Sequence, residues 1–223
     1  MLIPYRLDSR PEHQRFWAPA LAYLATHSSA DFRVEVVETA AHWESYWFPR
    51  AGFPIVRGWY RQLDLARNPL LFERRTSAPA YRAWLHWVGA RYIVLPHTRL
   101  DPLAGSREAR LVRASNLRLV LATPTVSVYE VARPTPILTG PAAAHLTRLS
   151  PGTIAGTLAA AGRYRLRIAA TPYMRVQRGA VCLEESGAGV TTLVARAPGP
   201  FKLAVPENPL ALIDPGSGRA ADC

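Results

Sequence analysis

The local pattern of the chain changes near residue 136, and this change constrains the fold more than any other feature. All six tryptophans lie before residue 88, and the amphipathic helical patterns lie in the same part. From Ile137 onward, short alternating runs separated by Gly and Pro turns replace them. The segment Ala132-Arg-Pro-Thr-Pro136 is typical of a linker. We therefore predict a mixed α/β (α+β) chain with a layered α/β domain over residues 1–134, a small antiparallel β-sandwich over 135–209 and a disordered tail over 210–223.

The first part of the chain mixes helices with apolar strands. Ser9 and Glu12 form a capping-box pattern ahead of apolar residues at helical spacing, so a helix is expected to end near residues 27–29. A second helix is predicted over residues 79–89, with Gly89 as its C-terminal cap. The other expected elements are a strand over 32–37, a strand over 91–96, a helix over 106–114, and strands over 117–121 and 125–131. This order is typical of a layered α/β domain.

The second part has the pattern of half-buried strands. In residues 163–168 arginines alternate with Tyr164, Leu166 and Ile168, and this period of two predicts one polar and one buried face. Further strands are expected over 145–149, 153–158, 180–183, 191–195 and 201–205. Glycines between these runs favour tight turns, so a sandwich of short antiparallel strands is predicted.

The formal net charge of +11 raises the question of an anionic partner. Lys202 is the only lysine, and the arginines are scattered from Arg6 to Arg219 without any block of five basic residues. We therefore interpret most of the charge as a solvated surface. The signatures of RRM and OB-fold proteins are also missing, so nucleic acid is not predicted as a partner.

Two further features concern the membrane and the cysteines. No apolar run approaches the roughly 20 residues that span a bilayer, and the N-terminus lacks the pattern of a signal peptide. Taken by itself, the sequence therefore predicts a soluble chain, which would be cytoplasmic if it stood alone. Cys182 and Cys223 set no disulfide framework, and their pairing is left open.

A polar and aromatic stretch over residues 39–64 is the candidate site. It combines three tryptophans with charged side chains and with turn-forming Pro and Gly residues. Aromatic rings can pack on sugar rings, arginines can bind a phosphate through forked donors, and carboxylates can accept hydrogen bonds from hydroxyl groups. The candidate binding residues are His42, Trp43, Glu44, Arg57, Trp59, Tyr60, Arg61, Gln62 and Asp64.

No catalytic motif accompanies this stretch. The sequence has no nucleophile elbow and no P-loop, and Gly187 and Gly189 lack the strand-to-helix context of a dinucleotide site. His42-Trp-Glu44 lacks the second histidine one helical turn on that a zinc site requires. No catalytic residue, metal site or cofactor is therefore predicted.

Three segments carry a resemblance to known proteins: residues 42–49 (HWESYWFP), 57–64 (RGWYRQLD) and 81–96 (YRAWLHWVGARYIVLP). Together they resemble the C-terminal extramembrane region of bacterial, especially actinobacterial, polytopic membrane proteins. Some of these proteins are grouped with the GT-C-type glycosyltransferases, which use polyprenyl-linked sugars. The similarity extends to residues 127–131, 137–141, 162–166 and 172–173, and thus covers most of the chain.

The resemblance implies a domain at the extracytoplasmic face of the cell membrane, in the cell envelope. GT-C enzymes keep their catalytic acid in an early loop among membrane helices, so no catalytic residue can be carried over to this chain. The implied function is a non-catalytic soluble domain that binds a glycan or a polyprenyl-phosphate sugar. Its implied partner is a membrane-embedded part of the same or another protein. The chain is then expected to be either a C-terminal fragment or a stand-alone relic of such a protein.

Three other interpretations stay open at this point. In the first, Trp43, Tyr46 and Trp47 are the buried side of a short helix, while Arg57 and Asp64 hold a long loop through ion pairs. In the second, the chain is an interaction module that docks on a membrane partner or envelope polymer. Its anion-binding surface would be the alternating arginines Arg163, Arg165 and Arg167. In the third, it is a hydrolase that uses carboxylates such as Glu38, Glu44 and Asp64.

Overall fold

A computed structural model describes residues 10–58, 61–169, 171, 173–185, 189–205 and 223. The chain has the mixed α/β composition expected from the sequence, with helices, a mixed sheet and antiparallel sheets. It divides into two compact units, Met1–Ser28 with Arg33–Thr135 and Ser29–Phe32 with Pro136–Cys223. Ser9 of the expected capping box and residues 210–222 of the expected tail lie outside the described residues.

The short segment Ser29–Phe32 belongs to the second unit although it precedes the first strand. The Asp31 carboxylate accepts a hydrogen bond from the Leu146 amide at 2.6 Å, and the Asp31 carbonyl accepts one from the Ile137 amide at 2.8 Å. These bonds join residues more than a hundred positions apart, so local sequence patterns carry no sign of them.

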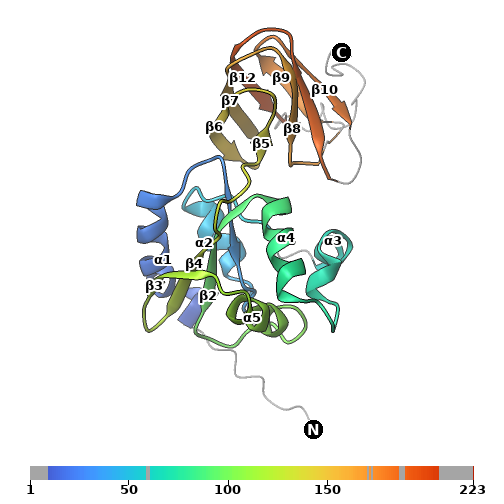
Figure 1. The fold of residues 1–223 in the computed structure, drawn as a ribbon. Coiled ribbons are helices and arrows are strands. Elements are labelled where there is room, and N and C mark those ends of the chain that lie inside the picture. Colours follow the sequence, from blue (N-terminus) through green and yellow to red (C-terminus); the bar gives the residue numbers. More distant parts are fainter. Residues whose placement is uncertain (1–9, 59–60, 170, 172, 186–188, 206–222) are drawn as a thin grey trace. The chain divides into compact units, whose positions relative to one another are not determined.

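The first unit contains five α-helices, two 3₁₀ helices and four strands in its described part (Figure 1). In chain order they are η1 (Arg10–Glu12), α1 (Gln14–His27), β1 (Arg33–Val36), α2 (Glu44–Arg50), α3 (Arg61–Arg67), η2 (Pro69–Leu71), α4 (Ala78–Val88), β2 (Ala90–Pro96), α5 (Gly105–Ala114), β3 (Arg118–Ala122) and β4 (Val126–Glu130).

The sheet of this unit has the order β1-β2-β4-β3, in which β1 and β2 are parallel and the other pairs are antiparallel. Helix α1 lies along one face of the sheet, and α4 and α5 lie along the other (Figure 1). Successive residues of β2 supply both cores: Tyr92 and Val94 pack with α1, whereas Ile93 and Leu95 pack with α4 and α5. The unit is therefore a three-layer α/β/α domain.

Helix α4 forms where the sequence predicted a helix. The Ser77 side chain accepts a hydrogen bond from the Ala80 amide at 3.3 Å, and Pro79 occupies the first turn. The helix ends at Gly89, which has a φ of 71°. A glycine adopts this left-handed conformation without a Cβ clash, so the expected cap is confirmed.

Two short helices begin in the 39–64 stretch, where the sequence allowed one short helix around Trp43, Tyr46 and Trp47 as an alternative. Helix α2 places Phe48 against Trp17 of α1, with ring centroids 5.4 Å apart. The chain then runs beside β1, where the Val34 amide donates to the Pro54 carbonyl at 2.8 Å and the Val56 amide donates to the Val34 carbonyl at 3.1 Å. Residues 54–56 thus cover the outer edge of β1, and α3 follows.

The second unit contains two four-stranded antiparallel sheets, with the orders β10-β11-β8-β5 and β6-β7-β12-β9. Their strands are β5 (Leu138–Thr139), β6 (Ala144–Ser150), β7 (Thr153–Leu158), β8 (Gly162–Leu166), β9 (Arg175–Arg178), β10 (Val181–Glu185), β11 (Thr191–Ala195) and β12 (Gly199–Ala204).

Alternate residues of these strands fill one apolar core. Tyr164 and Leu193 from the first sheet, and Ile154, Phe201 and Leu203 from the second, are buried in it. The alternation places the intervening polar residues on the two outer faces. The expected β-sandwich is present, whereas the sequence pattern missed the short strands β5 and β9.

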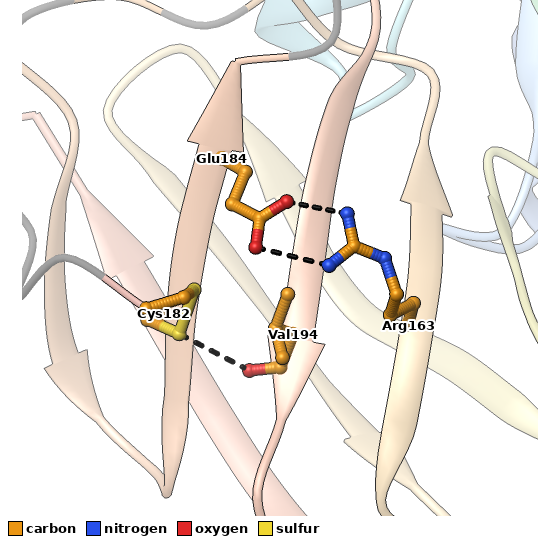
Figure 2. Close-up of a disulfide and its surroundings, with 5 residues drawn as sticks. Arg163, Cys182, Glu184 and Val194 are labelled. Atoms are coloured by element: carbon orange, nitrogen blue, oxygen red, sulfur yellow. Dashed lines mark hydrogen bonds and ion pairs between the residues drawn. A yellow bond between two sulfur atoms is a disulfide. The ribbon is translucent and has the colours of Figure 1, made fainter.

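A disulfide joins Cys182 on β10 to Cys223 at the end of the chain (Figure 2). Cys182 lies on the outer face of its sheet, and its sulfur contacts the Val194 carbonyl of the neighbouring strand β11. The pairing that the sequence left open is therefore present. In the described part of the chain, no helix combines the length and apolar character of a membrane span.

Candidate functional site

The candidate residues of the 39–64 stretch that the structure describes lie in different surroundings. Arg57 and Asp64 are buried, together with carboxylates from other elements. His42, Trp43 and Glu44 lie at the beginning of α2. Of the remaining candidates, Gln62 on α3 is exposed, and Trp59, Tyr60 and the side chain of Arg61 lie outside the described part of the structure. Among the described candidates, the structure thus buries Arg57 and Asp64 in one charge cluster and places His42, Trp43 and Glu44 at the beginning of α2.

Arg57 is the centre of a buried group of charges that we call the Arg57 cluster: Glu35, Glu38, Arg57, Asp64 and Glu108. Its Nε lies 2.8 Å from Oε1 of Glu35. One terminal nitrogen, Nη2, lies 2.5 Å from Oε2 of Glu108. The other, Nη1, lies 3.2 Å from Oδ2 of Asp64 and 3.5 Å from Oε1 of Glu38. All three guanidinium nitrogens are therefore occupied by carboxylates.

The cluster connects four parts of the first unit. Glu35 lies on β1 and is the residue between Val34 and Val36, so its side chain points to the face covered by α4 and α5. Glu108 lies on α5 and Asp64 on α3. The guanidinium thus ties the chain after α2 to the sheet and to two helices.

Uncharged polar side chains complete the hydrogen bonds of two of these acids. The Tyr81 hydroxyl donates to Oε1 of Glu108 at 2.8 Å. The Asn68 amide nitrogen donates to Oδ1 of Asp64 at 2.8 Å, and the Trp84 indole donates to the Asn68 carbonyl oxygen at 3.0 Å. A buried network with this many satisfied partners holds its members in one geometry.

Four acids surround one base, so full ionisation would leave three negative charges uncompensated. Burial raises the pKa of Glu35 well above its ordinary value, although Arg57 opposes the rise. Burial likewise raises the pKa of Glu38 to about 7, again against the attraction of Arg57. Burial and the negative charge of Glu108 also raise the pKa of Tyr81. Protons on the surplus carboxyls therefore supply part of the missing positive charge.

His42 and Glu44 interact at the beginning of α2, and the charge of His42 also acts on Glu38 of the Arg57 cluster. The Glu44 carboxylate accepts hydrogen bonds from the Thr39 hydroxyl at 2.6 Å and the Thr39 amide at 3.2 Å. His42 has a φ of 56°, and its Nδ1 lies 3.6 Å from Oε1 of Glu44. The interaction with Glu44 raises the pKa of His42, against the effect of burial. The pair fixes the turn that leads into α2.

Four side chains at α2 form a group that we call the α2 aromatic surface: Trp43, Tyr46, Trp47 and Arg50. Tyr46 and Arg50 are exposed, whereas Trp47 is half-buried and packs against the core shared with α1. Tyr46 is 47% exposed and lies edge-on to both tryptophans, with centroid distances of 6.1 Å to Trp43 and 4.8 Å to Trp47. The Arg50 guanidinium lies 5.7 Å from the centre of the Tyr46 ring. Phe48 and Glu44, rather than Trp43 and Tyr46, are the buried residues of this helix.

These environments decide which chemistry each group can perform. The Arg57 side chain is 3% exposed and its nitrogens are bound by carboxylates, so it has no free edge for a phosphate. Asp64 and Glu44 are buried and hydrogen-bonded, which favours structural roles for both. Among the described residues, no group of three or more His, Cys, Asp and Glu side chains could hold a metal ion. In the described part of the 39–64 stretch, the α2 aromatic surface offers an exposed aromatic side chain, that of Tyr46, to a ligand.

Sequence reasoning missed two central members of the Arg57 cluster, Glu35 and Glu108. Both are 0% exposed. The local sequence around each residue indicated a buried carboxylate. Glu35 interrupts an apolar strand, and Glu108 shares the buried face of α5 with Ala109 and Val112. A carboxylate at a core position requires a partner, but the sequence could not identify Arg57 as that partner.

Comparisons with protein-family models, with curated proteins and with solved structures find no match to this chain.

Proposed function

We propose that this chain is a non-catalytic extracytoplasmic domain of a membrane glycosyltransferase-like protein, and that it binds a glycan or lipid-linked sugar through the α2 aromatic surface. The exposed Tyr46 ring between two tryptophans carries the proposal. Exposed aromatic rings offer flat apolar faces for the C–H groups of a sugar ring. Arg50 beside Tyr46 adds a cation that suits the phosphate of a polyprenyl-phosphate sugar.

The state of the carboxylates supports the non-catalytic part of the proposal. A glycosidase needs two carboxyl groups on either side of an accessible bond. Glu38 and Asp64 contact Arg57, and Glu44 binds Thr39, so all three carboxylates of the hydrolase alternative are held by protein groups. Catalysis in such a system would belong to membrane-embedded segments of the same or a partner protein.

The Cys182–Cys223 disulfide supports the proposed location. Disulfides form and persist in oxidising compartments and are rare in the bacterial cytosol. The resemblance of residues 42–49, 57–64 and 81–96 to extramembrane regions of polytopic proteins points to the same side of the membrane.

Titration calorimetry of the purified chain with a polyprenyl-phosphate sugar and with neutral oligosaccharides tests this function. Tyr46→Ala should lower the affinity about tenfold, which corresponds to about 1.4 kcal/mol of lost ring contact. Trp87→Ala, at an exposed tryptophan of α4, is the matched control and should leave the affinity unchanged.

Arg50→Ala separates the two ligand classes. It should weaken binding of the phosphate-linked sugar while leaving a neutral glycan unaffected. Equal affinities of the wild-type and Tyr46→Ala chains would refute the proposed surface.

A further inference from the structure

The two outer faces of the β-sandwich differ in the interactions that their basic residues make. On the β10-β11-β8-β5 sheet, Arg163 forms a two-bond ion pair with Glu184 on β10 (Figure 2). Arg167 donates to the Pro136 carbonyl at 2.8 Å and to the Thr139 hydroxyl at 3.1 Å. The arginine face that the sequence suggested for anionic headgroups is thus largely engaged within the protein.

The opposite sheet carries basic residues without acids. Its four strands contain Arg148, Arg175, Arg178 and Lys202, and no Asp or Glu occurs in any of them. No ion pair joins Arg148, Arg178 or Lys202 to an acid in the described part of the chain, and all three side chains are exposed. Near this sheet, the Asp31 carboxylate is already bound by the Leu146 amide and by His145.

Strand register places these cations in one row. Arg148 on β6 lies opposite Ala155 on β7, Ala155 lies opposite Lys202 on β12, and Lys202 lies opposite Arg178 on β9. Neighbouring strands are about 5 Å apart, so the row extends over roughly 15 Å of the sheet. We call Arg148, Arg178 and Lys202 the basic row.

The like charges of the basic row repel one another modestly, and a bound anion would relieve this repulsion. Like charges directly opposite each other on a sheet repel, and Lys202 and Arg178 form such a pair. The small side chain of Ala155 leaves the middle of the row open, so a charged surface can approach several cations at once.

We propose that the β6-β7-β12-β9 face docks on an anionic phospholipid bilayer through the basic row. A surface of headgroup phosphates matches this pattern, because it presents many negative charges in one plane to three cations on three strands of the sheet. This docking is independent of sugar binding at α2, and each surface has its own test.

Co-sedimentation of the full chain with vesicles tests the proposal. Vesicles of phosphatidylglycerol and phosphatidylcholine should bind the chain, and vesicles of phosphatidylcholine alone should not. Binding should weaken as the salt concentration rises, because the interaction is electrostatic. The triple variant Arg148→Ala, Arg178→Ala, Lys202→Ala should lose about 100-fold in affinity, at about fivefold for each basic residue.

A charge-matched triple variant is the control: Arg74→Ala, Arg75→Ala, Arg113→Ala. These arginines are exposed residues of the first unit, so the control removes the same charge from another surface. It should lose less than about threefold in affinity. The single variant Lys202→Glu provides a second and milder disruption of the row.

Three outcomes would overturn the proposal. The first is equal vesicle binding by the basic-row triple variant and the wild-type chain. The second is an equal loss in both triple variants, which would mean that only net charge matters. The third is wild-type binding to soluble polyphosphate but not to vesicles, which would identify a free polyanion as the ligand. Tyr46→Ala should retain vesicle binding, so failure of the sugar site would not affect this result.

Discussion

The Arg57 cluster and the basic row differ in both the burial and the balance of their charges. The cluster buries one guanidinium among four carboxylates, whereas the row exposes three cations on strands that contain no acid. The cluster has a surplus of acid and the row has a surplus of base. They lie in different units of the same chain.

The difference shows that burial determines whether a charged group needs a partner within the protein. A buried group exchanges its hydration for protein partners, so the cluster needs internal partners and retains protons on carboxyls such as Glu38. An exposed group remains hydrated and screened, so the row can stay uncompensated until an external anion binds. An excess of buried charge therefore affects the stability of the fold, whereas an excess of exposed charge can be used to bind an external ligand.

Removal of the buried cation should have the largest effect. Arg57→Met leaves several buried carboxylates without their common partner, so the free energy of unfolding of the first unit should fall by about 4 kcal/mol. Tryptophan fluorescence during urea unfolding measures this unit selectively, since all six tryptophans precede residue 88.

Arg50→Met is the matched control for this measurement, because Arg50 is an exposed arginine of the same stretch. It should change the free energy of unfolding by less than about 0.5 kcal/mol. If Arg57→Met were as mild as the control, the Arg57 cluster would not stabilise the first unit.

The acid surplus should appear as a pH dependence of stability. In the folded state the pKa of Glu38 is about 7, against an ordinary value of 4.5. Between these two values the folded chain holds the proton more tightly than the unfolded chain, so its stabilising effect is complete below pH 4.5 and is lost as pH rises through 7. The expected loss is about 3 kcal/mol, and the raised pKa of Glu35 acts in the same direction.

Glu38→Gln tests the origin of this dependence, because glutamine mimics the protonated carboxyl. The variant should unfold with a flatter pH profile between pH 5 and 8 and should be more stable than the wild-type chain at pH 8. Lower stability of Glu38→Gln at pH 8 would mean that ionised Glu38 is a net stabilising partner of Arg57.

A charge reversal in the basic row should have the smallest effect. Arg178→Glu places a carboxylate opposite Lys202, so it should stabilise the second unit by about 0.5 kcal/mol. Hydrogen exchange of the β12 amides reports this change without interference from the first unit. Gln177→Glu adds an acid at the neighbouring residue, which lies in the β9 register shift and has no residue directly opposite. An equal gain in both variants would argue against the paired geometry of Arg178 and Lys202.

Local sequence patterns were sufficient for most elements of the fold. The helix over 79–89 is α4 within one residue at each end, since its Ser and Gly caps and its apolar spacing act within the helix itself. The strands over 153–158 and 191–195 have the predicted bounds. The sequence offered α2 only as an alternative, with Trp43 and Tyr46 rather than Phe48 and Glu44 as its buried residues, and it did not predict α3. Each of these helices has only seven residues and is held in place by contacts outside the helix.

The sequence by itself determined the mixed α/β composition, the change to β-structure after residue 136 and the aromatic character of residues 39–64, because these follow from periodicity and residue type. Only the tertiary structure decided that this stretch contains a buried ion cluster and an exposed aromatic surface. It also decided that Arg148, Arg178 and Lys202 lie in one exposed row across the β6-β7-β12-β9 sheet, whereas Arg163 on β8 is paired with Glu184. The physical reason is that charge partners are chosen by proximity in the fold. Glu35 and Glu108 reach Arg57 from 22 and 51 positions away, and no local pattern encodes that distance.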